Sequence, residues 1–396
     1  MIDLDPMIRQ NERIKICVVT GGRSDYGPLR PVLEKLKHST KLDLSVVAAG
    51  MHLCKEFGST VDNIIADGFP VDDRVEVIPV GDSFTDMAEA SGMGTARFAR
   101  CFERLKPVAV MVLGDRFEIF AAASAATLMR IPVVHLCGGD VTEGAIDDVL
   151  RHAVTKMAHL HFPSNTQSAD RILQMGEAPD RIEIVGSPGI DAIMNFDFLD
   201  RTEIEARLEF ALRARNYLVT FHSVTLQSDH GLQDLKTLLA VLEDFGEDTG
   251  LIFSMPNMDA GGQQLSAMVQ QFVSERENRV FKANLGQALY LSTLRAVDAV
   301  VGNSSSGLSE APSLGTATLN VGRRQANRLR GCSVIDCPAD SARIRAAFVD
   351  VEKLGSKVFE NPYGDGKSAP RIVAALEAVP NFPMLLRKSF YEASLI

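Results

Sequence analysis

Acidic side chains gather after two predicted strand ends in the first half of the chain. Asp115 and Asp140 each follow a short apolar run, and Asp147 and Asp148 open the helical pattern that comes next. An isolated acidic pair at a helix start usually compensates the helix dipole. Four carboxylates that converge on one sheet edge are different, because crowding raises the pKa of a carboxyl group toward the range of general acid/base catalysis. We therefore predict proton-transfer chemistry at this edge.

A serine-rich turn in the second half predicts a phosphate site. Residues 297–315 read VDAVVGNSSSGLSEAPSLG, which is an apolar run, a small polar turn and a helix-like segment. Backbone N–H groups at a helix start favour an anion. Ser304 and Ser305 add hydroxyl donors, Gly307 lets a ligand approach the backbone, and Glu310 is placed to accept ribose hydroxyls. An ordinary serine-capped helix is the alternative for this stretch alone.

Arginines would supply the positive charge that a diphosphate needs. The formal net charge is −10 and no basic block stands out, which argues against nucleic-acid binding and leaves anion binding to local arginines. Arg324 belongs to a run with three arginines, and Arg23 follows the first predicted strand. Arg116 and Arg151 stand beside the acidic group, where they would keep neighbouring carboxylates charged.

Two cofactor patterns are weak. The loop 20–27 lacks GxGxxG, because Arg23 stands where a glycine would let a pyrophosphate approach, and this disfavours NAD. His159 and His161 have HxH spacing without an adjoining cysteine or carboxylate cluster, so no metal site is predicted. His222 ends a predicted strand and is a candidate proton donor or diphosphate partner.

The elements that carry these residues alternate between strand and helix. Apolar runs without in/out alternation are separated by amphipathic helical patterns, which predicts parallel sheets covered on both faces. A break at residues 186–189, GSPG, separates two such series. We predict an α/β chain of two doubly wound Rossmann-like domains with the ligand in the cleft between them. The predicted parts are a first domain at 1–188, a nucleotide-binding domain at 189–380, and a helical tail at 381–396 that packs back near the hinge.

Composition indicates an ordinary soluble protein. The 396 residues are 46% hydrophobic and 23% charged, and no apolar run is long enough to cross a bilayer. The six cysteines form no CxxC pair and mostly lie in or beside apolar segments, which favours a reducing compartment. We expect a cytoplasmic protein that binds neither membrane nor nucleic acid.

The motifs, taken in order, resemble the hydrolysing UDP-N-acetylglucosamine 2-epimerases of sialic-acid and related nonulosonic-acid synthesis. The resemblance covers residues 14–380, and its most specific part is HLCGGDVTEGAIDDVLRHAVTKMAHLHF at 135–162. It implies the glycosyltransferase-B architecture, a homodimer, and no metal or redox cofactor. The shorter motifs are TGGRSDYG (20–27), GDRFE (114–118), PNMDAG (256–261), GNSSSGLSEAPSLGT (302–316) and GRRQANR (322–328).

The resemblance also implies roles for single residues. The reaction would eliminate the nucleotide diphosphate across C1–C2 to a glycal and then add water with inversion at C2. Cys137 stands where many relatives carry a glutamate that looks catalytic, so the resemblance shifts an acid/base role to Asp140; Ser223 replaces a usual proline. The diphosphate would contact Arg23, His222, Ser304, Ser305 and Arg324, the ribose Glu310, and the sugar Asp115, Asp147, Asp148 and Arg151, with Asn257 lining the cleft.

Several functions remain open at this level. The first expectation is release of N-acetylmannosamine and UDP from UDP-N-acetylglucosamine. The same chemistry on UDP-N,N'-diacetylbacillosamine or a GDP-linked counterpart, for legionaminic-acid synthesis, is the alternative within the family. A glycosyltransferase is possible because fold alone does not decide function, although four converging aspartates disfavour an acceptor site. A non-catalytic nucleotide-sugar sensor would show no proton exchange at C2.

Overall fold

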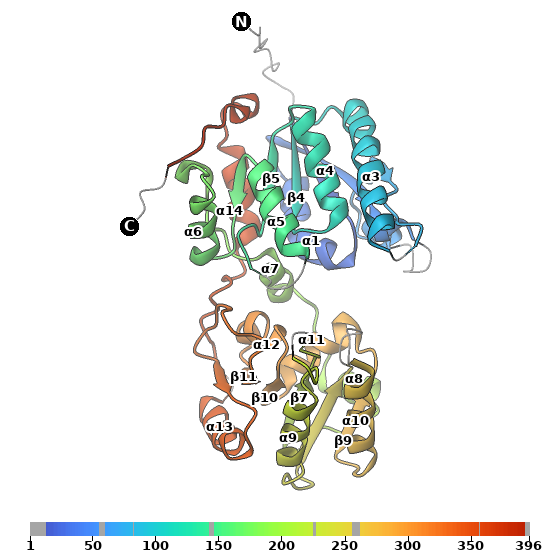
Figure 1. The fold of residues 1–396 in the computed structure, drawn as a ribbon, viewed down its shortest axis with the longest axis vertical. Helices are drawn as coiled ribbons and strands as arrows, with labels where there is room; N and C mark the ends of the chain where they lie inside the picture. Colours follow the sequence, from blue (N-terminus) through green and yellow to red (C-terminus); the bar gives the residue numbers. More distant parts are fainter. Residues whose placement is uncertain are drawn as a thin grey trace, which may run out of the picture. The chain divides into compact units, whose positions relative to one another are not determined.

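The computed structural model describes residues 13–54, 60–81, 83–141, 146–224, 227–255, 262–355 and 357–392. Two compact units make up the chain: unit 1 is Met1–Ala192 with Gly366–Ile396, and unit 2 is Ile193–Asp365. Each unit is a parallel sheet with helices on both faces (Figure 1). Among the described residues, no helix is both long and apolar enough to span a membrane.

Unit 1 has a six-stranded sheet in the order β3-β2-β1-β4-β5-β6, which is the order of a Rossmann fold. All neighbouring strands pair in parallel. The prediction of a doubly wound first half is therefore confirmed. The strands are β1 (Ile14–Thr20), β2 (Leu42–Ala49), β3 (Asp73–Val75), β4 (Ala109–Leu113), β5 (Val133–Leu136) and β6 (Leu160–Phe162).

The uninterrupted apolar character of β1 follows from burial on both faces. Ile16 and Val18 enter one core, and Cys17 and Val19 enter the opposite core. Helices α1 (Arg23–Lys37), α2 (Val61–Ala66) and α14 (Ser368–Glu377) contribute to the first core, whereas α3 (Phe84–Leu105), α4 (Phe117–Leu128) and α5 (Ile146–Met157) contribute to the second. The remaining helices that begin in unit 1 are α6 (Thr166–Gln174) and α7 (Pro188–Met194), with 3-10 turns at Gly50–Leu53, Pro179–Arg181 and Phe382–Leu386.

Helix α14 belongs to unit 1 although it comes late in the chain. Its apolar residues Ile372 and Leu376 are fully buried in the same core as Leu29 of α1. Asp191 caps the helix by accepting hydrogen bonds from the Ser368 hydroxyl at 2.8 Å and the Ala369 amide at 2.7 Å. The predicted boundary of the second domain at 189–380 includes residues 366–380, whereas the structure assigns them to unit 1. The local pattern does not indicate which core the apolar face enters.

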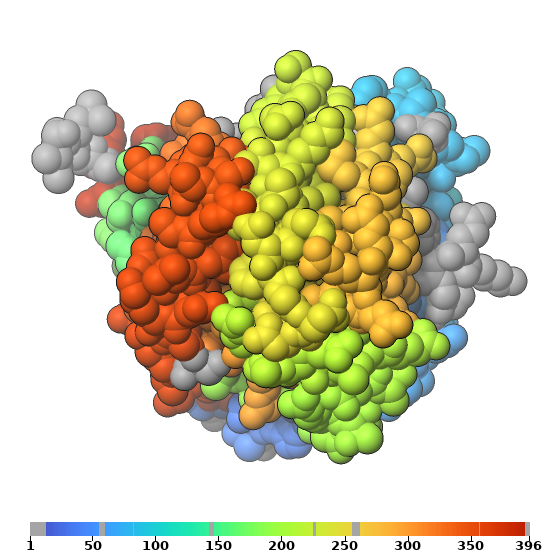
Figure 2. Space-filling model, turned by 90° about the horizontal axis from the view of Figure 1, so that it is seen from below, coloured from blue at the N-terminus to red at the C-terminus, as the bar shows by residue number. Residues whose placement is uncertain are grey.

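Unit 2 has a second six-stranded parallel sheet, in the order β12-β11-β10-β7-β8-β9. Helices α13, α9 and α10 lie side by side on one face, seen in red-orange, yellow and gold (Figure 2). The sequence pattern did not predict β12 or α13. The elements are α8 (Arg201–Leu208), β7 (Arg215–Thr220), α9 (Leu232–Leu242), β8 (Thr249–Ser254), α10 (Gly262–Ser274), β9 (Arg279–Lys282), α11 (Gly286–Ala296), β10 (Ala299–Gly302), α12 (Ser306–Ser309), a 3-10 turn at Ala311–Leu314, β11 (Ala317–Val321), β12 (Val334–Cys337) and α13 (Ser341–Leu354).

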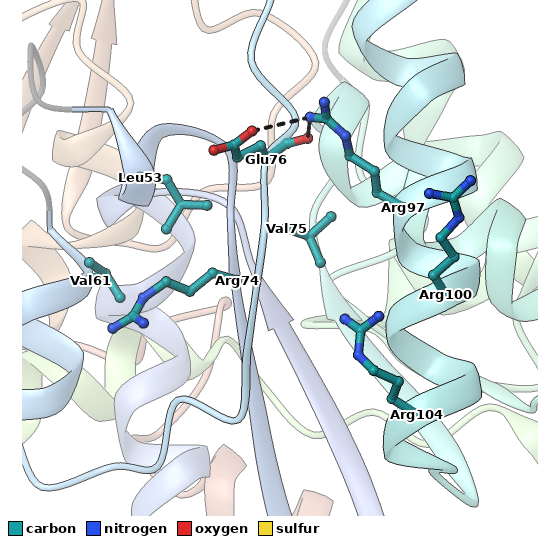
Figure 3. Close-up of a pocket in the computed structure, with 8 residues that line it drawn as sticks. All are labelled: Leu53, Val61, Arg74, Val75, Glu76, Arg97, Arg100 and Arg104. Carbon is teal, nitrogen blue, oxygen red and sulfur yellow. Dashed lines mark hydrogen bonds and ion pairs between the residues drawn. The ribbon is translucent and has the colours of Figure 1, made fainter.

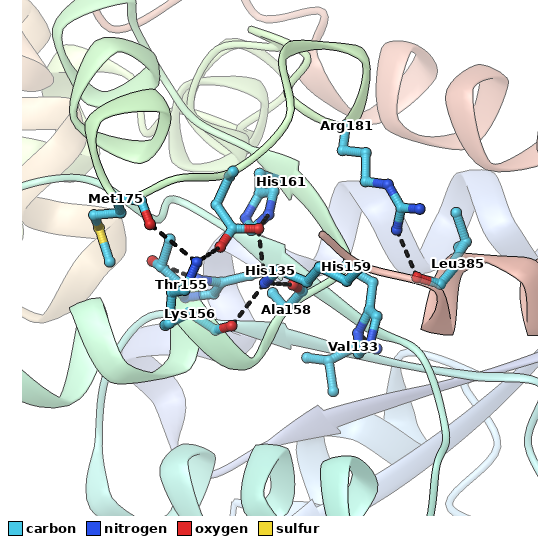
Figure 4. Close-up of polar contacts among 12 residues, drawn as sticks. Val133, His135, Thr155, Lys156, Ala158, His159, His161, Met175, Arg181 and Leu385 are labelled. Atoms are coloured by element: carbon cyan, nitrogen blue, oxygen red, sulfur yellow. Dashed lines mark hydrogen bonds and ion pairs between the residues drawn. The ribbon is translucent and has the colours of Figure 1, made fainter. Parts of the chain in front are cut away.

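Arg181 holds the segment after α14 by donating to the carbonyl oxygen of Leu385 at 2.6 Å (Figure 4), and Lys388 adds further contacts. Its ammonium group donates to the carbonyl oxygens of Lys156 and Ala158, each at 2.7 Å, and pairs with Glu177 Oε2 at 2.7 Å. Glu177 also accepts from His161 Nε2 at 3.0 Å. Burial alone would raise the pKa of Glu177, but its hydrogen bonds with His161 and the two lysines lower that pKa to about 2.

His159 and His161 therefore make hydrogen bonds within unit 1 that stabilise its structure. His161 is fully engaged on the Glu177 side, and His159 Nδ1 accepts from the Val133 amide at 3.1 Å. Burial lowers the pKa of His159 to about 4, which keeps this acceptor unprotonated at neutral pH.

Candidate active site

Arg151 is the centre of the acidic group in unit 1. Its buried guanidinium pairs with Asp115, which follows β4, and donates to the carbonyl oxygen of Asp140 at 2.8 Å, just after β5. Asp148, one turn earlier on α5, lies 3.4 Å from the same group. The fork of a guanidinium can serve several oxygens at fixed angles, so one side chain holds two loops and a helix together. The structure thus brings together Asp115, Asp140, Asp148 and Arg151.

Asp147 stands at the exposed start of α5 and differs from its neighbours. Partial loss of solvent and the negative charge of Asp115 raise the pKa of its carboxyl group, while Arg116 and Arg151 oppose the shift. In the described part of the chain, no hydrogen bond or ion pair holds its carboxyl group in place. The raised pKa favours the protonated form of Asp147 more than in an ordinary exposed aspartate.

Asp140 is held by α6. Its carboxylate accepts a hydrogen bond from the hydroxyl of Ser168, a buried residue whose backbone amide donates to the N-cap side chain of Asn165 at 3.0 Å. The approach depends on Gly139, which has a φ of +80° and whose Cβ, if present, would lie 2.2 Å from the Ser168 carbonyl oxygen. Glycine at position 139 is thus a requirement of close packing between this loop and α6.

His135 fixes the loop before Asp115 and was not among the predicted site residues. Its Nε2 lies 2.9 Å from the carbonyl oxygen of Gly114, and its Nδ1 lies 3.1 Å from the Thr155 hydroxyl. A carbonyl only accepts, so Nε2 carries the proton and Nδ1 accepts from Thr155. Complete burial lowers the pKa of His135 to about 3, which keeps the ring neutral.

Glu118 is a second residue that the predicted site omitted, although it ends the GDRFE motif. The side chain is fully buried, and Arg116 Nε donates to its Oε1 at 2.6 Å. A Cβ on Gly21 would lie 2.5 Å from Glu118 Cγ, so the Glu118 side chain fills the space beside Gly21, just after β1. Arg116 was expected to hold the aspartates charged; its charge does oppose the rise in the pKa of Asp147, although its hydrogen bond goes to Glu118. Burial raises the pKa of Glu118 despite this arginine.

Cys137 does not have the character of an acid/base group at neutral pH. It adopts the left-handed backbone conformation, with a φ of +59°. Burial, reinforced by the nearby charge of Asp140, raises the pKa of its thiol to about 12. The thiol therefore stays protonated where a carboxylate would be charged.

Arg23 is exposed on the first turn of α1, where its surroundings differ from the expected anion site. The backbone amides of Gly21 and Gly22 donate to the carboxylate of Asp25, at 2.7 and 2.8 Å. These amides are consequently engaged by the protein's own carboxylate. The predicted contact of this loop with a diphosphate thus depends on the Arg23 side chain alone.

Asn303 organises the predicted anion site of unit 2. Its side chain accepts from the His222 amide at 2.7 Å and donates to the His222 carbonyl at 2.8 Å. Its own carbonyl accepts from Arg324 at 3.1 Å and Gln325 at 2.9 Å. His222 and Arg324, expected together from the sequence, are thus joined through a residue that was not predicted.

The serine turn after β10 is built differently from the predicted helix start. Helix α12 has only four residues, so its dipole contributes little to anion binding. The serine hydroxyls would be the main donors to an anion at this turn. Ser304 is nearly buried, and half-buried Ser305 occupies the N-cap position of α12 without a capping side-chain hydrogen bond. Gly307 was expected to admit a ligand, but a Cβ there would lie 2.5 Å from Thr318, so its small size serves packing on β11.

A pocket of about 410 Å³ opens beside this turn at the carboxyl ends of β7 to β10. Tyr290 lies in its wall together with Thr220, Ser304 and Ser306, and burial raises the pKa of its hydroxyl to about 12. Glu310 accepts a hydrogen bond from Ser306, and burial raises the pKa of its carboxyl group. The pocket also includes His222, Lys282, Asn284 and Gln287.

Some predicted residues lie outside the described ranges. Asn257 belongs to residues 256–261, which the structure does not describe. Residues 142–145, in the loop between Asp140 and Asp147, also lie outside the described ranges. Within the described ranges, no group of three or more histidine, cysteine or carboxylate side chains is arranged to hold a metal ion.

Known proteins match this chain along most of its length. A family model described as UDP-N-acetylglucosamine 2-epimerase matches residues 34–377. A GDP/UDP-N,N'-diacetylbacillosamine 2-epimerase (hydrolyzing) from Campylobacter jejuni is 37% identical, covering 87% of this chain and 88% of that protein. A UDP-N,N'-diacetylbacillosamine 2-epimerase (hydrolyzing) from Legionella pneumophila is 35% identical, covering 94% of this chain and 98% of that protein.

Solved structures share the fold. UDP-GlcNAc 2-epimerase from Neisseria meningitidis, bound to UDP-GlcNAc, matches with a TM-score of 0.74 at 20% identity, covering 92% of this chain and 99% of that chain. The enzyme from Methanocaldococcus jannaschii gives a TM-score of 0.75 at 16% identity, with the same coverage. The predicted glycosyltransferase-B type of fold is confirmed. The chain belongs to the UDP-N-acetylglucosamine 2-epimerase family, among the hydrolysing nucleotide-sugar 2-epimerases.

Proposed function

We propose that the protein hydrolyses a nucleotide-diphosphate 2-acetamido sugar with inversion at C2, and that nucleotide-linked N,N'-diacetylbacillosamine is its preferred substrate. Two relatives that act on this sugar are 37% and 35% identical to the chain, whereas a UDP-N-acetylglucosamine 2-epimerase from Neisseria meningitidis is 28% identical. UDP-N-acetylglucosamine, the first expectation from the sequence, becomes the second candidate.

The nucleotide would occupy the pocket of unit 2. Hydroxyl groups of Ser304 and Ser306 line it with the charged side chain of Lys282, and His222 stands at the end of β7. Such donors stabilise the charge that develops on a departing diphosphate. Glu310 would accept the ribose hydroxyls, and Arg324, anchored beside Asn303, would complete the anion site.

The chemistry would lie with the carboxylates of unit 1, and the arrangement around Arg151 is the observation that carries this proposal. Asp115 would take the proton from C2 while the C1–O bond breaks and its electron pair leaves with the diphosphate. Asp147, whose pKa is raised, would return a proton to C2 of the glycal, and water would add at C1 while its proton passes back to the Asp147 carboxylate. Asp148 and Arg151 would orient Asp115 and Asp147. Asp140, which Ser168 of α6 holds in place, would support them or share the proton transfer.

Incubation of the purified protein with candidate nucleotide sugars in deuterated water tests the proposal. The UDP and GDP forms of N,N'-diacetylbacillosamine and UDP-N-acetylglucosamine are compared at equal concentration. We expect release of free sugar with inverted configuration and one deuterium at C2, fastest from a diacetylbacillosamine substrate. Transfer of sugar to an acceptor without C2 label would indicate a glycosyltransferase, and binding without turnover would indicate a sensor. A cytoplasmic homodimer remains a prediction.

A further inference from the structure

The carboxyl group of Glu118 occupies a space that two glycines leave open at the carboxyl ends of β1 and β2. A Cβ on Gly21 would lie 2.6 Å from Glu118 Oε1, and a Cβ on Gly50 would lie 3.2 Å from the same oxygen. Gly21 directly follows β1, and Gly50 directly follows β2. Glu118 itself stands in the first turn of α4, after β4. Its side chain thus reaches from α4 to the ends of the two neighbouring strands.

Only one oxygen of this buried carboxyl group has a partner among the described residues. Oε1 accepts from Arg116 Nε at 2.6 Å, whereas Oε2 is buried without a hydrogen-bond partner. The Glu118 side chain is fully buried, while 36% of the Arg116 side chain is exposed. A buried carboxylate loses hydration that attraction to one cation repays only in part, so such a pair is a weak source of stability. This imbalance points to a role of the pair in the neighbouring site.

Arg116 connects the ion pair with the carboxylates assigned to the reaction. It is the N-cap residue of α4 and directly follows Asp115, whose carboxylate pairs with Arg151 on α5. Asp147 stands on α5 one turn before Arg151, and α4 contacts α5. Burial and the charge of Asp115 raise the pKa of Asp147. The positive charges of Arg116 and Arg151 oppose that rise.

Pairing with Glu118 reduces the positive charge that Arg116 presents to Asp147. Without the Glu118 carboxylate, the full charge of the guanidinium group would favour the ionised form of Asp147 and so remove its proton. Asp25 also acts on Arg116, but its carboxylate already accepts from two backbone amides of the loop after β1. Glu118 is therefore the carboxylate that compensates Arg116 by direct contact.

We propose that Glu118 is a positioning residue of the reaction: it holds Arg116 at Nε and compensates its charge, so that Asp147 keeps the proton it delivers. This proposal rests on the proposed function, because it assigns the proton donor to Asp147. Glu118 acts through Arg116 and does not itself touch the substrate.

A carbon-13 NMR titration of the full chain, labelled at its aspartate carboxyl groups, tests the proposal. The Asp147 signal is identified by its loss in Asp147→Asn. Glu118→Gln keeps an acceptor for Arg116 but removes the charge, so the pKa of Asp147 should fall. Arg116→Ala removes the opposing charge, so the same pKa should rise. The double variant should match Arg116→Ala, because Glu118 acts through Arg116.

The pH dependence of turnover gives a second readout, which a merely structural role of Glu118 would not move. The decline of turnover at high pH should begin at a lower pH in Glu118→Gln. At pH 8, the ratio of its turnover to its own maximum should be at least about threefold lower than in the unmodified protein.

The matched control is Glu76→Gln, which also removes a carboxylate paired with an arginine in unit 1. Glu76 lies 3.6 Å from Arg97 of α3, in a pocket apart from the candidate site (Figure 3). This variant should keep the Asp147 titration and the pH profile of the unmodified protein. Thermal unfolding checks that each variant is folded.

An unchanged pKa of Asp147 in Glu118→Gln would overturn the proposal, and so would an unchanged pKa in Arg116→Ala if the first variant does not fold. A lower unfolding temperature of Glu118→Gln with an unchanged pH profile would show a packing role only and would also overturn it. Release of C2-labelled sugar with an unchanged Asp147 titration would leave the proposed function standing without this role. The expected titration shifts without any sugar release would support the charge balance and contradict the proposed function.

Discussion

His135 donates a hydrogen bond from Nε2 to the carbonyl oxygen of Gly114, over 2.9 Å, immediately before Asp115. Because the ring is neutral and buried, protonation would break its hydrogen bond from Thr155 at Nδ1. The folded-state pKa of about 3 lies below the ordinary value of 6.5, so in this window the unfolded chain binds a proton that the folded chain does not. Stability is therefore present above pH 6.5 and is lost as the pH falls toward 3.

We predict that His135→Gln removes part of this pH dependence. Glutamine keeps a donor near Gly114 but does not titrate. Between pH 7 and pH 5 the unmodified protein should lose about 2 kcal/mol more unfolding free energy than the variant, from a limit of about 1.4 kcal/mol per pH unit for one proton. Urea unfolding at the two pH values measures the difference. Equal losses would show that His135 does not stay neutral in the fold.

Lys388 should stabilise unit 1 through Glu177, whose side chain is fully buried. Lys388→Met removes one partner of this network and leaves a buried charge less compensated, at a cost of about 3 kcal/mol in unfolding free energy. The matched control is Lys353→Met, because Lys353 pairs with Asp350 on the exposed face of α13. That change should cost less than about 1 kcal/mol. Similar small costs for both variants in urea unfolding would contradict a stabilising role of the tail.

Cys137→Ser should retain most turnover, because a thiol whose pKa is raised to about 12 contributes no thiolate at neutral pH. Alkylation by iodoacetamide should be correspondingly slow at Cys137 and fast at exposed Cys332, which serves as an internal control. Peptide mass spectrometry follows the two sites in parallel. Rapid alkylation of Cys137 that substrate prevents, together with collapse of turnover in the serine variant, would place the thiol in the chemistry.

Glu310→Ala should weaken UDP binding about tenfold or more, since a hydrogen bond to a charged group contributes roughly 1.5–3 kcal/mol. Turnover at saturating substrate should change much less, because the ribose contact exists in the ground state and the transition state alike. Glu275→Ala, on an exposed residue after α10, controls for the lost charge. UDP affinity that is the same in both variants would move the nucleotide away from this pocket.

The sequence predicts strands and helices well where burial is two-sided. The apolar run of β1 has a single explanation, because alternate residues enter opposite cores. Helix α13 escaped prediction although Ile344, Phe348 and Val351 mark a buried helical face, and β12 beside it is short and partly exposed. The placement of α14 in unit 1 depends on a contact with α1 that no local pattern records.

Some residues of the candidate site could likewise be predicted from the sequence, and others could not. Asp115, Asp140 and Arg151 could be selected because strand ends of one parallel sheet meet at the same edge. Asn303 and Glu118 were missed because their importance lies in tertiary contacts: one joins β7 to β10, and the other fills the space beside Gly21. Tyr290 stands inside an otherwise ordinary helix, where spacing does not distinguish a pocket residue from a packing residue.

In the proposed mechanism, the carboxylates around Arg151 transfer the proton at C2. The most direct test of this mechanism is the rate of C2 deuteration with turnover in deuterated water for Asp147→Asn, beside Asp115→Asn, with UDP affinity measured on the same samples. Asparagine preserves shape but cannot titrate, so each variant should turn over at least about a hundredfold more slowly with nearly unchanged UDP affinity. Because Asp147 acts in its protonated form, turnover of the unmodified protein should fall as the pH rises above the raised pKa of this group, and the variant should lack that limb. Near-normal deuteration in both variants would contradict the account.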